Sequence, residues 1–189
     1  MELGDITIRR AVSSDAATIA TLHTASWRDA YAALLDPTYL AGPIEDERRA
    51  LWSDRLEHPD PRRTTLLAET ADATALGFGC VYRDLDPAWG SLIDNLHVDP
   101  QRRGQRIGSH LMEAVARCVE TNAELSGIHL WVFEANEAAL RFYIRLGGEV
   151  VERSASQVPT SRGRTILRVF WPDIAVLAAC PGQVERRGA

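Results

Sequence analysis

The sequence predicts a single α/β (α+β) domain, built on a mixed, twisted central sheet of about seven strands with helices on both faces. Short apolar runs typical of strands alternate along the chain with amphipathic stretches of helical period. The length of 189 residues suits one domain, and 46% hydrophobic and 25% charged residues are typical of a soluble globular protein. We expect residues 1–171 to form this domain and residues 172–189 to form a tail, either mobile or packed on a partner chain.

The first half of the chain begins with apolar residues at every second position, which predict a strand. A serine at 13 or 14 is a suitable cap for the helix that follows. Two later strands are joined by a short turn, so we expect them to be antiparallel. The expected elements are a strand at 5–12, a helix from 13 or 14 to 34, a turn at 38–40, a helix at 44–57 and strands at 64–69 and 76–83.

The second half continues the alternation of strands and helices. The run 128–133 is almost continuously apolar, as is typical of a strand covered on both faces. Two glycines at 147 and 148 predict the end of the helix after it. The expected elements are a strand at 90–98, a helix from 107, a strand at 128–133, a helix ending at 147 and closing strands at 149–157 and 165–171.

Composition and charge exclude several classes of protein. A net charge of −5 without a basic run argues against a nucleic-acid partner, because phosphate neutralisation supplies most of that binding energy. The sequence has no apolar run of about 18 residues, so we expect no membrane partner. Its first residues lack a basic and apolar leader, and we expect a cytoplasmic protein.

Lysine and cysteine usage exclude further chemistry. All 21 basic residues are arginine, and without lysine the chain has no P-loop, no kinase site and no Schiff-base nucleophile. Cys80, Cys118 and Cys180 lie far apart without C-x-x-C spacing, which argues against a disulfide framework and a zinc site. We therefore expect no metal and, since no cysteine has an activating context, no covalent acyl-enzyme.

The most informative segment is LIDNLHVDPQRRGQRIGS, residues 92–109. An apolar strand breaks at Pro100 into a turn of arginine and glycine that opens an amphipathic helix. The start of a helix exposes unpaired backbone N–H groups and the positive end of the helix dipole. The segment therefore predicts a site for an anion such as a phosphate.

A second informative segment is LWVFEANEAALRFYIRLGG, residues 130–148. It reads as a strand followed by a helix that carries Asn136 and Tyr143. A separation of seven residues is about two helical turns, so both side chains point to the same side. Asn136 is also a natural helix N-cap.

Together these segments resemble the GNAT superfamily of N-acetyltransferases. The superfamily pattern Arg/Gln-x-x-Gly-x-Gly/Ala, which holds the pyrophosphate of acetyl-CoA, reads here Arg103-Gly104-Gln105-Arg106-Ile107-Gly108. The match departs at Arg106, where the superfamily usually has glycine; a backbone N–H can still donate there if φ is negative. The resemblance implies cofactor contacts from Leu96, His97, Val98, Arg103, Gly104, Gln105, Arg106, Ile107, Gly108, Ser109, Asn136 and Tyr143.

The resemblance also implies how the chemistry is divided. The sheet splits between its fourth and fifth strands to admit acetyl-CoA, and backbone N–H groups at residues 96–98 polarise the thioester. Tyr143 matches the general acid: a phenol with a pKa of about 10 can protonate a thiolate of about 8.5. Its alternative is a core aromatic. Asp94 occupies the place of an acidic base, or is merely a solvated or ion-paired aspartate, and His97 is a second candidate base.

The acceptor site implied by the resemblance is built from the first two helices and the last strand connection. We hypothesise that a small cationic amine binds there against Trp27, Tyr31 and Asp94, since a cation over an aromatic ring gains about 1 kcal/mol. Alternatives are acetylation of a protein N-terminus or lysine, or a catalytically silent acyl-CoA-binding module. Superfamily members often pair through their C-terminal strands, so we also expect a homodimer. Further residues in the acceptor regions are Asp29, Asp36, Tyr39, Glu45, Asp46 and Glu47.

Overall fold

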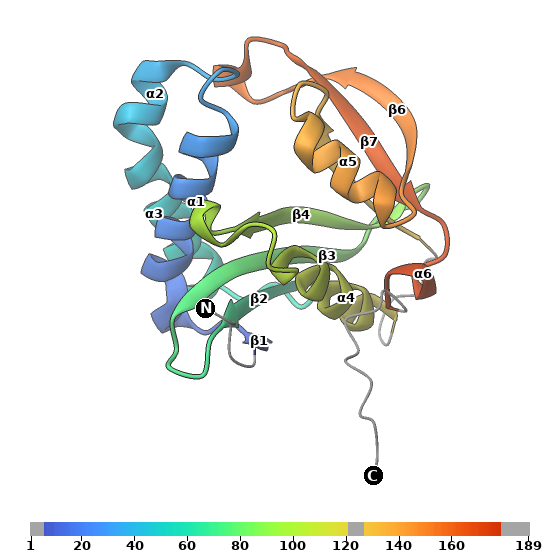
Figure 1. Ribbon diagram of the computed structural model, residues 1–189, viewed down its shortest axis with the longest axis horizontal. Coiled ribbons are helices and arrows are strands. Elements are labelled where there is room, and N and C mark those ends of the chain that lie inside the picture. Colours follow the sequence, from blue (N-terminus) through green and yellow to red (C-terminus); the bar gives the residue numbers. More distant parts are fainter. Residues whose placement is uncertain (1–5, 121–126, 179–189) are drawn as a thin grey trace.

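A computed structural model of the chain describes residues 6–120 and 127–178. Its centre is one seven-stranded sheet in the order β1-β2-β3-β4-β5-β7-β6 (Figure 1). Only β4 and β5 pair in parallel; every other neighbouring pair is antiparallel. The strands are β1 (Thr7–Arg10), β2 (Arg63–Glu69), β3 (Ala75–Asp86), β4 (Gly90–Val98), β5 (Ile128–Phe133), β6 (Glu149–Ala155) and β7 (Thr165–Trp171).

Helices cover both faces of the sheet, which confirms the predicted mixed architecture (Figure 1). Helices α4, α5 and α6 pack on one face around a core that includes Leu111, Leu130 and Val169, all buried. Helices α1 and α3 pack on the other face, around Trp52 and Phe78. The helices are α1 (Ala16–Ala30), α2 (Pro37–Ala41), α3 (Pro43–Glu57), α4 (Ile107–Glu120), α5 (Glu137–Arg145) and α6 (Ala175–Ala178).

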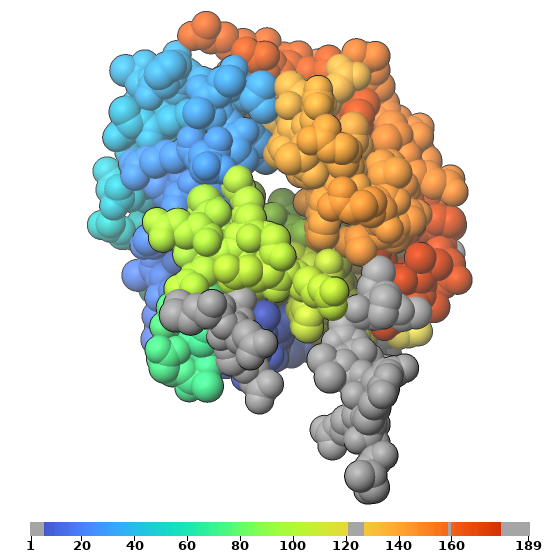
Figure 2. All heavy atoms as spheres, viewed as in Figure 1, coloured from blue at the N-terminus to red at the C-terminus, as the bar shows by residue number. Residues whose placement is uncertain are grey.

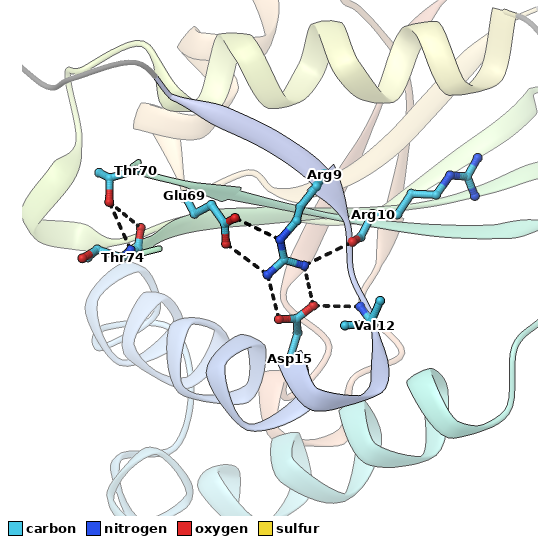
Figure 3. A network of polar contacts seen from close by, with 7 residues as sticks. All are labelled: Arg9, Arg10, Val12, Asp15, Glu69, Thr70 and Thr74. Atoms are coloured by element: carbon cyan, nitrogen blue, oxygen red, sulfur yellow. Dashed lines mark hydrogen bonds and ion pairs between the residues drawn. The ribbon is translucent and has the colours of Figure 1, made fainter. Parts of the chain in front are cut away.

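The start of α1 differs from the prediction. Neither Ser13 nor Ser14 caps it; with Asp15 they form a short 3-10 turn, and α1 begins at Ala16. The Asp15 carboxylate instead accepts from the Val12 amide at 2.7 Å and from the Arg9 guanidinium (Figure 3). An ion pair to the first strand has therefore taken the place of a simple serine cap.

The beginning of the C-terminal segment packs against the rest of the domain. Residues Ala175–Ala178 form α6, and Leu177 is fully buried in the core beside α4. The first residues of the predicted tail thus pack on the protein's own core. The remainder of the predicted tail, including Cys180, lies outside the described residues.

The two parallel strands separate half-way along their length. Pairing of β4 with β5 ends at Ile93 and Leu130. On the other side of β4 the register with β3 shifts by one residue, because Asn95 opposes Cys80 while Ile93 opposes Val81. The extra residue is Asp94, so a β-bulge lies where the strands part. From Asp94 onward one edge of β4 has no strand partner in the described part of the chain, as the predicted split requires.

Candidate active site

A pocket of about 710 Å³ opens between α1, β4, β5, α5 and the loop that precedes α4. Figure 2 shows the surface hollowed between α1 in blue, this loop in yellow-green and α5 in orange. Most residues of the predicted site line it: Tyr31, Asp94, Leu96, His97, Val98, Arg103, Gly104, Arg106, Ile107, Gly108, Ser109, Asn136 and Tyr143. Trp27 and Gln105 are not among the lining residues.

The start of α4 offers unpaired backbone donors to this pocket. Within the described residues, the amides of Ile107, Gly108 and Ser109 have no backbone acceptor; the first amide with one is that of His110, which donates to Arg106. Gly104, just before the helix, has φ +79° and nothing near the position of a Cβ. The segment is thus an open cradle of N–H groups at the positive end of a helix, which fits the pyrophosphate of a nucleotide cofactor.

Arg106 adopts the conformation that glycine favours. Its φ is +60°, so the condition of a negative φ stated from the sequence is not met. A left-handed conformation costs a residue with a Cβ roughly 1 kcal/mol or more. The chain therefore holds an arginine in a conformation that glycine favours, at a position where the superfamily usually has glycine, and the local strain is the consequence.

Arg103 links the cradle to the first helix. Its guanidinium forms an ion pair with Asp29 of α1, and both side chains are about half exposed. An exposed pair of this kind contributes little to stability. It does fix the arginine at the mouth of the pocket, beside the unpaired amides.

Asn136 and Tyr143 face the pocket together, as their spacing predicts. Asn136 is the N-cap of α5, and its side chain accepts from the Ala139 amide at 3.3 Å. The Asn136 side chain also forms a hydrogen bond with the Tyr31 hydroxyl; this bond lowers the pKa of Tyr31, but burial raises it more. Asn136 thus joins the end of α1 to the start of α5 across one end of the pocket.

Tyr143 keeps its proton at neutral pH. Its side chain is 8% exposed and packs against Phe142 and Trp171, with ring centroids 5.3 Å and 6.1 Å away. Burial, and secondarily the neighbouring Tyr31, raise the pKa of Tyr143 well above its usual range. A protonated phenol lining the pocket is a proton donor rather than a base.

Asp94 points from the bulge toward α3. Its Oδ2 accepts from Arg55 at 2.7 Å and also from the Asn95 side chain. No partner of Oδ1 is found in the described residues, and Asp94 lines the pocket. Both sequence interpretations therefore still apply to this carboxylate, since it is ion-paired through one oxygen and open at the other.

His97 turns its ring away from the cradle, toward α1. Its Nδ1 lies 3.0 Å from the Ser26 hydroxyl, and its ring centroid is 4.6 Å from that of His23. Burial, helped by the charges of Arg48 and Arg103, lowers the pKa of His97 to about 3. A neutral imidazole with so little affinity for a proton is a poor general base, so the geometry disfavours that role.

Trp27 lies beside the pocket rather than in its wall. The guanidinium carbon of Arg48 is 4.8 Å from the centroid of its ring, and Tyr31 packs edge-on at 5.3 Å. The protein's own arginine thus covers the ring that was expected to receive a cationic substrate.

Sequence reasoning missed a set of polar residues on α1 and α3. Arg48, Trp52 and Arg55 recur at helical spacing on α3, and this was the signal available in the sequence. His23 of α1 accepts from Trp52, and Ser26 of α1 contacts His97 of β4; neither residue was given a role from the sequence. Pattern alone does not separate a buried polar face from a core face.

The described residues contain no group of three or more His, Cys, Asp or Glu side chains arranged to hold a metal ion. In the same part of the chain, no helix has the length and hydropathy needed to cross a bilayer.

Solved structures define the class to which this fold belongs. PaiA N-acetyltransferase from Thermoplasma acidophilum, in complex with coenzyme A, superposes with a TM-score of 0.70 at 18% identity, covering 87% of this chain and 98% of that one. A spermidine N-acetyltransferase chimera from Vibrio cholerae and hSSAT gives a TM-score of 0.66 at 16% identity, with 91% and 98% covered. The architecture is that of the acyl-CoA N-acyltransferases.

The model of the acetyltransferase (GNAT) family matches residues 23–147, so the chain belongs to this family, as the sequence predicted. It is 32% identical over 117 residues to a mycothiol acetyltransferase of Brachybacterium faecium, and 34% over 106 residues to one of Mycobacteroides abscessus. The matches cover 61% and 55% of this chain but only 35% and 36% of those relatives. The chain thus aligns with about a third of each relative.

Proposed function

We propose that the protein transfers the acetyl group of acetyl-CoA to a primary amine of a small molecule, by direct attack in a ternary complex. The observation that carries this proposal is the split between β4 and β5, which connects the cradle before α4 to Tyr143 along one pocket. Family membership and the two mycothiol acetyltransferase relatives support an acetyl donor and a small-molecule acceptor.

Residues of the cradle would hold the diphosphate of the donor. The amides of Ile107, Gly108 and Ser109 are unpaired at the start of α4, and Arg103 adds a positive charge to the same pocket. When bound, acetyl-CoA supplies the acetyl group as a thioester. The unpaired edge of β4, residues 94–98, offers backbone N–H groups to orient and polarise its carbonyl.

Two side chains would move protons. Tyr143 holds a proton that its burial keeps in place, and it would donate this proton to the departing thiolate. The Asp94 Oδ1 would take a proton from the acceptor amine, directly or through water, because the ion pair with Arg55 engages only Oδ2. This assignment makes Asp94 both a substrate contact and the base.

Titration of the protein with acetyl-CoA by calorimetry tests the proposal, with CoA and NAD as comparison ligands. We expect saturable binding of acetyl-CoA and CoA, and none of NAD, since only the first two carry the pantetheine arm that the split admits. An amine panel with detection of free thiol then tests turnover. Failure to bind either CoA species would overturn the proposal.

A further inference from the structure

The acidic side chains around the acceptor region are already paired with arginines. Asp29 pairs with Arg103, and Asp94 pairs with Arg55 at 2.7 Å. Glu45 contacts arginines of both α1 and α3 at 3.5 Å and 3.2 Å. Each of these carboxylates is thus neutralised by the protein, and the region is poorly suited to an acceptor with several positive charges.

Aromatic rings near the site are covered in the same way. Arg48 lies over Trp27 at 4.8 Å, and Arg55 lies over Trp52 at 5.2 Å. A cationic substrate would have to displace a guanidinium to reach either face. The cation–π contacts therefore add to the argument against a polycationic acceptor.

Arg48 is a cation whose partners are incomplete. Its side chain is 16% exposed, and its ion pair with Glu47 is long, 3.5 Å, to a side chain that is itself 51% exposed. The Nε–H of Arg48 is buried and has no hydrogen-bond partner among the described residues. A buried charged donor without a partner is costly, so the geometry calls for an acceptor from outside the chain.

His23 supplies a second donor of this kind. The indole N–H of Trp52 donates to its Nδ1 at 3.0 Å, so the hydrogen of the neutral ring must lie on Nε2. The side chain is 1% exposed, and within the described chain Nε2 has no partner. Burial lowers the pKa of His23 well below its usual range, which leaves the ring neutral.

Neither donor is among the residues that line the pocket, but both border the ring of Trp27. The Trp27 ring is 5.3 Å from His23 and 4.8 Å from Arg48, so the two donors border the same indole. The ring of His97, which lines the pocket, is 4.6 Å from His23, and Arg48 is close enough to lower the pKa of both histidines. Arg55 acts on His23 and Arg103 on His97 in the same direction, so both histidines lie in a positive field.

We infer that the acceptor amine carries a carboxylate, which the free Nε–H edge of Arg48 binds with His23 Nε2–H as the second donor. The guanidinium edge matches the two oxygens of a carboxylate, and charge-assisted bonds of this type are the strong ones. The inference rests on the proposed function and replaces the hypothesis of a purely cationic acceptor. It places the acceptor's carboxylate beside Trp27 and its amine toward Asp94.

Acetylation of matched ω-amino acids and α,ω-diamines of equal chain length tests the inference. For the wild type we expect kcat/KM to favour the amino acids by about tenfold or more, as one charge-assisted interaction requires. Arg48→Gln should abolish this preference, and Arg48→Lys should restore it only in part, because lysine keeps the charge without the planar edge. Arg62→Gln, which alters an exposed arginine outside the acceptor region, should leave it unchanged.

Binding of butanoate supplies a readout independent of turnover. Calorimetric titration of the wild type and Arg62→Gln, with and without CoA, should show saturable binding that Arg48→Gln loses while retaining CoA binding and its circular dichroism. Wild-type preference for diamines, equal butanoate binding by Arg48→Gln, or no butanoate binding at all would each overturn the inference. Loss of CoA binding in the wild type would instead refute the proposed function, and butanoate binding would still decide the inference.

Discussion

Arg9 and Arg48 show two different uses of a guanidinium in one protein. Arg9 bonds to Asp15 at 2.7 Å and 3.0 Å and to Glu69 at 3.0 Å through two nitrogens, joining β1, β2 and the start of α1 (Figure 3). Arg48 has one long ion pair, contacts with Tyr39 and the Trp27 ring, and an unpartnered Nε. Yet Arg9 is 37% exposed and Arg48 only 16%. The more buried cation is the less satisfied one.

The contacts of Arg9 stabilise the fold, whereas the unpaired donor of Arg48 does not. The Arg9 group, defined here as Arg9, Asp15 and Glu69, satisfies its charges internally and holds three elements together. Elsewhere, donors stay free at Arg48 and His23 and at the start of α4, which lines the pocket. Since unpaired buried donors cost stability, their accumulation on one side of the molecule indicates a ligand site. Variants in the two regions should therefore affect different properties.

Tyr143→Phe should give the largest loss of activity, and this loss should be confined to turnover. Removing the general acid should lower kcat by about a hundredfold to ten-thousandfold, while the dissociation constant of acetyl-CoA and the thermal midpoint stay nearly unchanged. Steady-state release of free thiol measures kcat, and calorimetry measures the dissociation constant of acetyl-CoA and the thermal midpoint. Tyr82→Phe, on β3, is the matched control. Wild-type turnover by Tyr143→Phe would show that this tyrosine is only a core aromatic.

Asp94→Asn comes next and separates the two interpretations of this residue. If Oδ1 is the base, kcat should fall by about a hundredfold, with partial recovery at high pH, where more of the amine is already neutral. Arg55→Met removes the ion pair but keeps the carboxylate, and should cost much less turnover. Equal losses in the two variants, measured over the same pH range, would assign Asp94 to the ion pair only.

Asp15→Asn should change stability without changing turnover. The side chain is 12% exposed and accepts from both Arg9 and the Val12 amide, so we expect a loss of about 2 kcal/mol in the free energy of unfolding at neutral pH. Urea denaturation measures it. Asp54→Asn, at an exposed ion pair, should cost far less.

The same variant has a defined pH dependence. The hydrogen bonds from Arg9 lower the pKa of Asp15 in the folded state, below the value of about 3.9 in the unfolded state. Its contribution is therefore complete above that pH and is lost as the pH falls through the folded pKa. The difference in stability between wild type and Asp15→Asn should shrink under acid conditions. A difference that grows on acidification would contradict this account.

Periodicity and turn residues were sufficient to predict most of the fold. β4, β5 and β7 have their predicted bounds because each apolar run is delimited by Gly, Pro or charged residues. The predicted serine cap of α1 was wrong: the residue before α1 is Asp15, which Arg9 holds together with the sequence-distant Glu69. Local rules describe neighbours along the chain, and an ion pair across sixty residues is not among them.

The candidate site also contains residues that local spacing predicts and residues that it does not. Asn136 and Tyr143 could be placed on one side of a helix by counting residues, and both line the pocket. The corner formed by Arg48 and His23 could not be found, because its meaning lies in donors that lack partners. Only the three-dimensional structure shows which hydrogen bonds a buried group fails to make.

Arg106→Gly should give the smallest effect, and it sharpens the contrast between folding and site. At φ +60° the arginine strains the backbone, so glycine should raise the free energy of unfolding by about 1 kcal/mol, less the entropy that glycine adds to the unfolded chain. Its amide remains in the cradle, so acetyl-CoA binding should weaken only by the loss of one exposed charge. Arg162→Gly, at φ +52° in the last hairpin and away from the cradle, is the control for the backbone term. If Arg106→Gly is destabilised while Arg162→Gly is not, the Arg106 side chain rather than its backbone holds the loop in place.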